Sequence, residues 1–316
     1  MKEFIGYKKG VDLGGWLSQC CHTIEHYDSF IGKEDIDKIA SWGLDHVRLP
    51  IDYNLVEDNA GNVLEKGYEY IDSAVKWCGE AGLNLVLDLH KTAGYSFDKG
   101  EQEKGFFENE ALQERFYKLW EKLAKCYGKY SDRVAFELLN EVTDKSYSDK
   151  WNEIICRCVP KIRAYAPDTI IIMGGYWNNS PDALPDIVKP YDDKVVLSFH
   201  CYDPLEFTHQ GAEWVESMDP AFRMAFDGEK ITEDYFAERF SAAIETAEKY
   251  DAALYCGEYG VIDRANPQDA LKWYKAINGA FKRFDISRCA WNYKQKDFGL
   301  SDKWIESVID EIVHYI

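Results

Sequence analysis

The sequence predicts an α/β fold: a (β/α)8 barrel, in which eight parallel strands alternate with helices. Eight short segments rich in Val, Ile and Leu recur along the 316 residues, and they are continuous apolar runs rather than alternating ones. Continuous runs are typical of strands buried on both faces, as in parallel sheets. Stretches of helical periodicity lie between these runs, which favours alternating strands and helices. An open doubly wound sheet is the other arrangement with this alternation, but the sequence lacks the glycine-rich phosphate turn that usually follows its first strand.

The eight expected strands are short and spread over the whole chain. They are Gly10–Gly15, His46–Ile51, Asn84–Leu89, Val134–Glu141, Thr169–Gly175, Lys194–Tyr202, Ala253–Gly260 and Arg288–Lys294. Barrels of this kind run to about 250 residues as one domain, and more with insertions. No linker or internal repeat divides the chain, so residues 1–316 are predicted to form a single TIM barrel domain.

The expected helices carry apolar residues three or four positions apart, which places them on one face. In Tyr68–Ala81 these residues are Ile71, Val75 and Cys78, and the following Gly82 is a typical helix stop. The expected helices are Glu34–Trp42, Tyr68–Ala81, Asn109–Tyr127, Ser146–Tyr165, Thr232–Tyr250, Pro267–Phe284 and Asp302–Tyr315, with a further helix start at Ser180-Pro181-Asp182.

The connection after the sixth strand is unusually long for a loop between a strand and a helix. It runs over residues 203–230 and carries several large apolar side chains, among them Phe207 and Trp214. We predict that it forms a small helical insertion over the mouth of the barrel.

Composition excludes several classes of partner. The net charge of −19 argues against a nucleic-acid partner, which needs clustered basic residues. No run approaches 18 apolar residues, so no membrane span or membrane partner is expected. The first residues lack an apolar signal region, so the protein is expected to be cytoplasmic or secreted with its signal removed. Motifs for nucleotides, calcium and zinc are absent, so no cofactor or metal is expected, and a monomer is predicted.

Polar and aromatic side chains occupy the ends of the expected strands. They are Arg48, His90, Asn140, Glu141, His200, Tyr202, Glu258 and Trp291. Each of them alone has an ordinary structural explanation, such as a hydrogen-bonded core histidine or an arginine that pairs with a buried acid. In a closed barrel, however, the carboxyl ends of all strands meet at one rim, where the chemistry of such barrels takes place. We therefore expect these eight side chains to converge.

Two glutamates stand out in this group. A carboxylate at the end of a buried strand is costly unless it is used or paired. Glu141 and Glu258 would supply the two carboxyl groups that cleave a glycosidic bond, one as a proton donor and one facing the anomeric carbon. Their pKa values must differ, and an arginine beside one of them would keep that carboxylate ionised.

These residues match a known family. The chain resembles glycoside hydrolase family 5, whose members are retaining barrel glycosidases with catalytic acids on strands four and seven. Within that family it is most similar to small single-domain endoglucanases of clostridial type. The matching motifs are Gly14-Gly15-Trp16, His46-Val47-Arg48-Leu49-Pro50, Leu87-Asp88-Leu89-His90, Phe136-Glu137-Leu138-Leu139-Asn140-Glu141, Phe199-His200-Cys201-Tyr202, Gly257-Glu258-Tyr259-Gly260 and Ala290-Trp291-Asn292-Tyr293.

The resemblance implies a role for each residue at the rim. Glu141 would be the acid/base and Glu258 the nucleophile, and Arg48 and Tyr202 would support Glu258. Asn140 would bind the sugar 2-hydroxyl in the subsite before the cleaved bond. The same subsite would be completed by His90, His200 and Trp291.

The implied activity is that of a retaining β-glycosidase acting on β-glucans, foremost an endo-β-1,4-glucanase that also cuts mixed-linkage glucan. Its partner would be a β-linked oligosaccharide or polysaccharide. The connection at residues 203–230 is shorter than in these relatives, which leaves substrate length and endo or exo action open. The alternatives are an exo-acting β-1,3-glucanase or β-glucosidase, a β-mannanase, a xyloglucanase and, from another class, a non-catalytic sugar-binding barrel.

Further candidates for sugar contact lie just past strand ends or in long loops. They are His26, Tyr53, Tyr95, Trp177, Asn178, Phe207, Trp214 and Lys294. Aromatic rings are the main surfaces on which the flat apolar faces of sugars stack. The segment from His22 to His26 also fits the H-x-x-E-H pattern of inverzincin metalloproteases. That pattern requires a long helix, which the surrounding sequence does not predict, so we interpret it as a polar loop.

Overall fold

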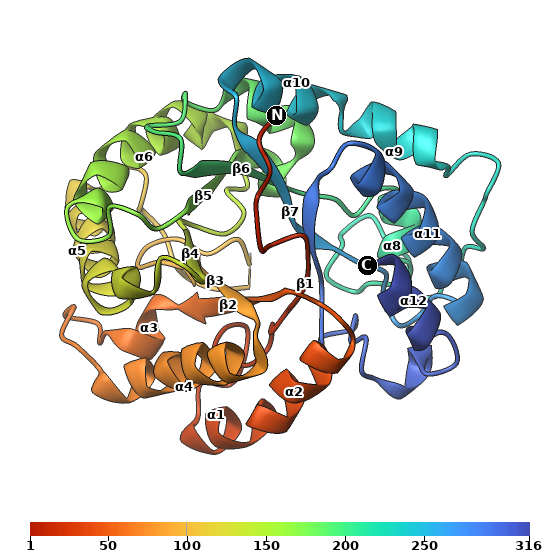
Figure 1. Ribbon diagram of the computed structural model, residues 1–316, viewed down its shortest axis with the longest axis horizontal. Coiled ribbons are helices and arrows are strands. Elements are labelled where there is room, and N and C mark those ends of the chain that lie inside the picture. The colour runs from red at the N-terminus through yellow and green to blue at the C-terminus, as the bar shows by residue number, and fades with distance from the viewer. Residues whose placement is uncertain (99) are drawn as a thin grey trace.

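The chain folds into a barrel of strands surrounded by helices (Figure 1). The structure, a computed structural model, describes residues 1–98 and 100–316. The strands are β1 (Lys9–Asp12), β2 (His46–Asp52), β3 (Asn84–Lys91), β4 (Val134–Glu137), β5 (Ile171–Gly174), β6 (Val195–His200), β7 (Ala253–Tyr259) and β8 (Ser287–Ala290). Neighbours in sequence pair in parallel, and β1 closes the barrel against β8. The predicted (β/α)8 barrel is confirmed.

The strands lie where the apolar runs predicted them, but several end earlier. The expected strand Val134–Glu141 stops at Glu137, so Glu141 lies in the following loop, with a φ of 31°. The apolar pattern overstates this strand because the loop residues Leu138 and Leu139 are as buried as the strand itself. All residues of β2 and β7 are buried, as expected for strands covered on both faces.

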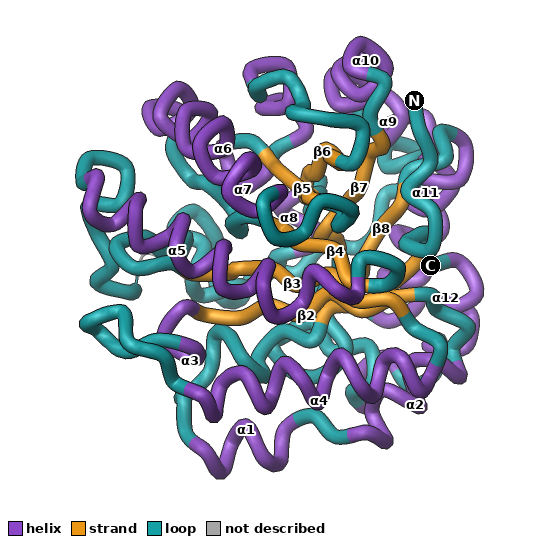
Figure 2. Tube along the Cα trace, turned by 60° about the vertical axis from the view of Figure 1, so that its left-hand side comes forward, coloured by secondary structure: helices purple, strands orange, loops and turns teal. Residues whose placement is uncertain are grey.

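Helices form the outer layer around the strands (Figure 2). They are α1 (Ile24–Phe30), α2 (Lys33–Ser41), α3 (Tyr53–Val56), α4 (Glu65–Ala81), α5 (Glu110–Tyr127), α6 (Ser148–Arg163), α7 (Tyr176–Asn179), α8 (Leu205–Thr208), α9 (Glu233–Arg239), α10 (Ser241–Tyr250), α11 (Pro267–Arg283) and α12 (Ile309–Tyr315). Short 3-10 turns occur at η1 (Gly128–Tyr130), η2 (Lys145–Tyr147), η3 (Pro181–Asp186) and η4 (Lys303–Ile305).

The main helices agree with their predicted positions. In α4 the face with Ile71, Val75 and Cys78 is buried, and Gly82 ends the helix at a left-handed φ of 74°. Two expected helices differ. The stretch Thr232–Tyr250 divides into α9 and α10 at Phe240, and the helical part of Asp302–Tyr315 is limited to η4 and α12.

The connection at residues 203–230 is less helical than predicted. Its helical part is α8, a single turn, and turns and bends make up most of the remaining segment. Gly211, Pro220 and Gly228 punctuate this stretch, and glycine and proline both disfavour a continuous helix. The segment is tied to the loop after β7, because the Thr208 carbonyl accepts a hydrogen bond of 2.9 Å from the Ile262 amide.

The amino-terminal end of the barrel is closed by aromatic rings. Phe4 stacks on Tyr7 with a centroid distance of 4.2 Å, and Tyr255 of β7 meets Phe4 edge-on. The polar residues lie at the opposite end of the barrel, where the strands finish. Among the described residues, no helix combines the length and the apolar character needed to cross a membrane.

Candidate active site

The carboxyl-terminal ends of the strands gather around one arginine of β2, Arg48. Its side chain has no exposed area. Nη1 donates to Glu258 Oε1 of β7 at 2.8 Å, and Nη2 donates to Asn140 Oδ1 at 2.9 Å. Arg48 thus joins the two halves of the expected rim, since Asn140 precedes Glu141 in the chain.

Three further carboxyl groups surround Arg48, and sequence reasoning did not single them out. Arg48 donates to Asp12 of β1 at 2.8 Å and to Glu137 of β4 at 2.6 Å, and Asp88 of β3 lies 3.0 Å from Nη2. The strand register brings them together, because Asp12 pairs with Arg48 and Asp88 pairs with Glu137 across neighbouring strands. The sequence did carry a signal for these acids, because each of the three is an acidic residue within an otherwise apolar, buried strand.

One guanidinium cannot neutralise four buried carboxylates. Burial raises the pKa of Asp88 to about 7, and it also raises the pKa values of Asp12 and Glu137. Each of these three acids has one buried oxygen with no hydrogen-bond partner among the described residues. An ionised oxygen in such a place is costly, so this arrangement favours protonated acids here. Burial alone would lower the pKa of Arg48, but the four acids together raise it well above its usual value.

Glu258 receives a second hydrogen bond from Tyr202, which follows β6. Tyr202 Oη donates to Glu258 Oε2 at 2.8 Å. Burial, followed by the nearby charge of Glu258, raises the pKa of Tyr202 well above its usual value, so the phenol keeps its proton and remains a donor. Each oxygen of Glu258 therefore has its own donor, an arrangement that stabilises the ionised carboxylate.

Glu141 has different surroundings. His200 of β6 places Nδ1 2.8 Å from Glu141 Oε1, and Asn178 donates to Oε2 at 2.8 Å. Burial raises the pKa of Glu141, although the hydrogen bond from Asn178 opposes the rise. Burial also lowers the pKa of His200 to about 4, so the imidazole is neutral near pH 7. The surroundings of the two glutamates thus differ: burial raises the pKa of Glu141, whereas both oxygens of Glu258 accept hydrogen bonds, from Arg48 and from Tyr202.

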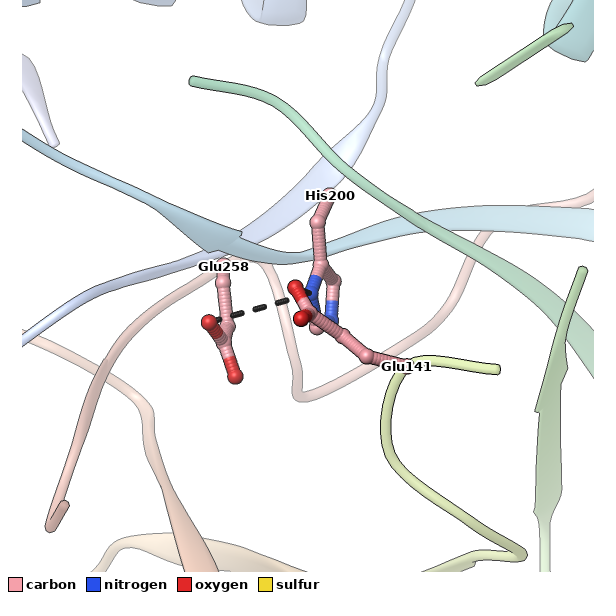
Figure 3. Close-up of side chains that lie close together, drawn as sticks. All are labelled: Glu141, His200 and Glu258. Atoms are coloured by element: carbon pink, nitrogen blue, oxygen red, sulfur yellow. Dashed lines mark hydrogen bonds and ion pairs between the residues drawn. The ribbon is translucent and has the colours of Figure 1, made fainter. Parts of the chain in front are cut away.

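The side chains of Glu141, His200 and Glu258 converge at the barrel mouth (Figure 3). A carboxylate oxygen of each glutamate and a ring nitrogen of His200 all lie within 4.8 Å of one another. Retaining glycosidases hold their two carboxyl groups about 5–5.5 Å apart, and inverting ones about 6.5–9.5 Å. The short separation fits the retaining arrangement.

The same three side chains are the group among the described residues whose ligand atoms could surround a metal ion. Their oxygens are already hydrogen-bonded by protein donors, Arg48 and Tyr202 on Glu258 and Asn178 on Glu141. A cation here would also lie close to the guanidinium. The arrangement therefore fits a pair of hydrogen-bonded acids better than a metal centre.

His90 and Trp291 form one wall of the site. Their rings lie parallel, with centroids 5.9 Å apart. His90 Nδ1 is 2.6 Å from Asp88 Oδ2, which fixes the ring. A side chain on Gly14 would meet the Trp291 ring at 2.4 Å, which explains the glycine of the Gly14-Gly15-Trp16 motif. The rim residues expected from the sequence are thus brought together.

The sugar-contact candidates outside the rim differ in their exposure. Trp177 and Trp214 are about half exposed, at 49% and 53%, with Lys145 over the ring of Trp177 and Arg264 over the ring of Trp214. The expectation that Phe207 stacks on a sugar is wrong, because its side chain has no exposed area and packs against Phe226. Tyr95 is also buried, and its hydroxyl donates to the main-chain oxygen of Glu141 at 2.7 Å.

Three other candidates are engaged within the protein. His26 Nε2 lies 2.7 Å from a backbone carbonyl, Lys294 Nζ donates to another at 2.9 Å, and the hydroxyl of Tyr53 donates to Glu103. The ring of Tyr53 also lies under a guanidinium, with 5.1 Å between them. Each of these three side chains thus has at least one polar atom bonded within the protein.

The H-x-x-E-H segment does not form a paired-histidine site. His22 precedes α1, and its Nε2 lies 3.1 Å from Asp52 Oδ2. His26 lies within α1 and reaches the Gly15 carbonyl instead. The two imidazoles therefore have separate partners. The expected polar loop is confirmed for His22 and Thr23 but not for the residues from Ile24 to His26, which begin the short helix α1.

Comparisons with known sequences identify the family of the chain. The sequence profile of the family described as cellulase (glycosyl hydrolase family 5) matches residues 8–297. The chain is 53% identical over 304 residues to cellodextrinase A of Ruminococcus flavefaciens, covering 96% of this chain and 88% of that protein. It is also 37% identical over 339 residues to endoglucanase C of Acetivibrio thermocellus, covering 99% and 98%.

Solved structures agree with the sequence comparisons. The clostridial cellulose synthase subunit Z of Clostridioides difficile superposes with a TM-score of 0.84 at 27% identity, covering 97% of this chain and 99% of that one. Thermotoga maritima Cel5A, solved with cellobiose, superposes with a TM-score of 0.83 at 23% identity, covering 97% of both chains, and this likeness speaks for the fold alone. The chain belongs to the cellulase family, glycosyl hydrolase family 5, and is a glycoside hydrolase whose substrate is a β-glucan.

Proposed function

We propose that the protein is a retaining β-1,4-glucanase that acts through a covalent glycosyl-enzyme, with Glu141 as acid/base and Glu258 as nucleophile. The observation that carries this proposal is the contrast between the two carboxyl groups. Glu258 accepts hydrogen bonds from Arg48 and Tyr202, whereas burial raises the pKa of Glu141. Two carboxyls within 4.8 Å of each other, one beside His200 and Asn178 and the other held by Arg48 and Tyr202, match the needs of double displacement.

In the first step, the carboxylate of Glu258 attacks the anomeric carbon, and an ester bond forms there. The bond from that carbon to the glycosidic oxygen breaks, and Glu141 transfers its proton to the departing oxygen. Arg48 and Tyr202 hold Glu258 on its attacking line. Asn140 adjoins the site and is suited to hydrogen-bond the sugar 2-hydroxyl, although its Oδ1 already accepts from Arg48.

In the second step, the ionised Glu141 takes a proton from water, and the resulting hydroxide attacks the anomeric carbon. The ester to Glu258 breaks, and the carboxylate is restored. Two inversions at one carbon give a product with the configuration of the substrate. His200 remains neutral near pH 7, so it keeps its bond to Glu141 without adding a charge between the two acids.

The sugar before the cleaved bond would lie between His90, Trp291 and the two glutamates. The parallel rings of His90 and Trp291 offer an apolar wall beside Asn140. We assign the half-exposed indoles of Trp177 and Trp214 to sugars farther along the chain. We further propose that residues 1–316 act as one domain and as a monomer, with residues 203–230 beside the mouth.

Two relatives bear on the substrate. The relative at 53% identity is named a cellodextrinase and the one at 37% an endoglucanase. Both names agree with β-1,4-linked glucose, and the more similar sequence favours soluble cellodextrins over insoluble cellulose. We therefore place short β-1,4-glucans first, with mixed-linkage glucan second. Exo-acting β-1,3-glucanase or β-glucosidase, xyloglucanase and β-mannanase activities are the outcomes that would redirect this assignment.

The catalytic assignment is tested by exchanging each glutamate for glutamine. Glu258→Gln should abolish turnover of cellotetraose, because the amide cannot form the ester. Glu141→Gln should lower kcat/KM by about 100- to 10,000-fold, the usual contribution of a general acid. Circular dichroism verifies folding in both variants. Wild-type turnover in either variant would reject the assignment, and folded wild-type protein without product on any β-glucan would favour a non-catalytic barrel.

The substrate assignment is tested by product profiles on cellodextrins, carboxymethyl cellulose, lichenan, laminarin and mannan. We expect the enzyme to cleave cellodextrins, carboxymethyl cellulose and lichenan, which all contain β-1,4 bonds, and to release a spread of short products. Glucose as the sole product would indicate exo action, and preferred hydrolysis of laminarin or mannan would overturn the β-1,4-glucan assignment. Proton NMR of the first product gives the stereochemistry, for which we expect the β anomer.

A further inference from the structure

The turn after β5, which is the short element α7, has an unusual backbone. Trp177, Asn178 and Asn179 follow one another with φ values of 50°, 55° and 55°. Such left-handed conformations are uncommon outside glycine, least so for asparagine, and a bulky residue there is an outlier. Three in succession persist only where the surroundings hold them, and such positions cluster at functional sites.

This turn is anchored to the loop that carries Glu141. The Asn178 amide donates to the Val142 carbonyl at 3.0 Å, and the Ser180 amide closes the turn on the Tyr176 carbonyl at 3.1 Å. The backbone of the turn is therefore fixed relative to the residue that follows Glu141.

The result is that one side chain of the turn reaches Glu141 directly, and the next contacts His200, which is itself a partner of Glu141. Asn178 Nδ2 donates to Glu141 Oε2 at 2.8 Å. Asn179 is 2% exposed, and its Nδ2 lies 3.4 Å from Nε2 of His200, whose Nδ1 meets the other oxygen of Glu141. Trp177, the first residue of the turn, leaves half of its indole exposed beside them.

We propose that Asn178 is a positioning residue, held by the left-handed turn, that aims the carboxyl of Glu141 at the leaving oxygen and stabilises it as its proton departs. This inference rests on the proposed role of Glu141 as acid/base. An amide nitrogen only donates, so its bond to Glu141 is stronger when the carboxyl is ionised. The bond therefore gains strength during the proton transfer itself, which is when an interaction accelerates the step.

The test separates substrates that need the proton from those that do not. A sugar leaving group must be protonated, whereas a dinitrophenolate departs unaided. We compare kcat/KM, which reports the steps up to the glycosyl-enzyme, for cellotetraose and for dinitrophenyl β-cellobioside. Asn178→Gly removes the amide and keeps a residue that tolerates the left-handed φ. Asn178→Asp keeps the side-chain shape but replaces the donor with an acceptor.

In Asn178→Gly we expect kcat/KM for cellotetraose to fall about 10-fold, the effect of one hydrogen bond to a charged group, with less than about 2-fold change for the aryl substrate. The alkaline limb of the pH profile for cellotetraose should move to higher pH, because the donor that favours the ionised Glu141 is gone. Asn178→Asp should move it further in the same direction, since a second carboxylate disfavours ionisation.

Equal losses on both substrates, or no loss on either, would overturn the proposal, because a merely structural residue cannot distinguish leaving groups. Tyr191→Phe is the control, because Tyr191 is 60% exposed and has no role in the site, and it should leave the alkaline limb in place. Glu141→Gly, measured on the same two substrates, keeps the proposals separate. If it spares the aryl substrate while Asn178→Gly shows no selectivity, only the role of Asn178 fails. If Glu141→Gly affects both substrates equally, the acid/base assignment fails.

Discussion

Arg48 holds Glu258 through a hydrogen bond of 2.8 Å inside a cluster of acids, and the guanidinium has no exposed area. The same guanidinium contacts Asp12, Asp88 and Glu137. Glu258 therefore obtains its counter-ion in competition with three other carboxyl groups. Protonation of those acids would resolve the competition in favour of Glu258.

The first prediction concerns Arg48 itself. Arg48→Lys keeps one positive charge but loses the planar fork that meets several acceptors at once. We expect kcat/KM to fall by more than about 100-fold and the free energy of unfolding to fall by about 3–5 kcal/mol, as for a broken buried ion pair. Steady-state kinetics and urea unfolding measure the two effects. A lysine variant with wild-type values would show that the fork is dispensable.

The second prediction compares two acids that share this arginine. If Glu137 is protonated, Glu137→Gln changes no charge, and its amide oxygen can still accept from Arg48 Nε. We expect kcat/KM on cellotetraose to stay within about 3-fold of wild type, since an isosteric neutral replacement leaves the hydrogen bond in place. Glu258→Gln is the matched control with the same chemical change on the same guanidinium. Inactivation of both variants to the same extent would contradict a protonated Glu137.

The third prediction concerns stability and pH at His22. Its hydrogen bond to Asp52 is the main cause that raises the pKa of His22 to about 9. Because this value exceeds the usual one of about 6.5, the charged imidazole stabilises the fold below about pH 6.5. The stabilisation declines as pH rises toward 9 and is then lost. At pH 6, His22→Gln should lower the free energy of unfolding by about 2 kcal/mol. At pH 10 it should lower it much less, because the imidazole is then uncharged in the wild type as well.

Urea unfolding at pH 6, 8 and 10 measures this dependence. In an Asp52→Asn background, His22→Gln should no longer show it, because the main partner of the imidazolium is gone. A difference between wild type and His22→Gln that is constant from pH 6 to pH 10 would refute the assigned protonation.

The fourth prediction tests Tyr95 beneath the acid. Its hydroxyl donates to the Glu141 carbonyl and accepts from the Thr143 amide at 2.8 Å. Tyr95→Phe leaves both backbone groups without this partner, which should cost about 1–3 kcal/mol of unfolding free energy. Tyr191→Phe is the control, because Tyr191 is 60% exposed. Equal thermal midpoints for the two variants would show that Tyr95 does not support this loop.

The fifth prediction separates the exposed and buried rings of the segment after β6. Trp214→Ala should raise KM for cellopentaose about 3- to 10-fold without lowering the thermal midpoint, as expected for a lost stacking surface. Phe207→Leu should lower the midpoint and leave KM unchanged, since Phe207 has no exposed area. The opposite pattern would mean that Phe207, rather than Trp214, reaches the substrate.

The sequence by itself determined the barrel and the membership of its rim. Continuous apolar runs located every strand, because burial on both faces leaves little choice of residue type. Since the parallel strands of a closed barrel all end at one face, His200 and Glu258 had to meet once the strands were known. Arg48 is the third residue of β2, and its long side chain reaches Glu258 from within the strand. The motif that contains Glu141 placed it at the same rim, although β4 itself ends at Glu137.

Only the tertiary structure decided how these groups are paired. The three acids around Arg48 come from β1, β3 and β4, and the register of the paired strands β1 to β4 brings them to one guanidinium. The exposure of side chains outside the strands depended on the tertiary structure still more. Phe207 and Trp177 are both aromatic residues of short segments that follow a strand, α8 and α7, yet one is buried and the other half exposed. The physical reason is that strand burial follows a local pattern, whereas the burial and partners of a loop side chain depend on segments distant in the sequence.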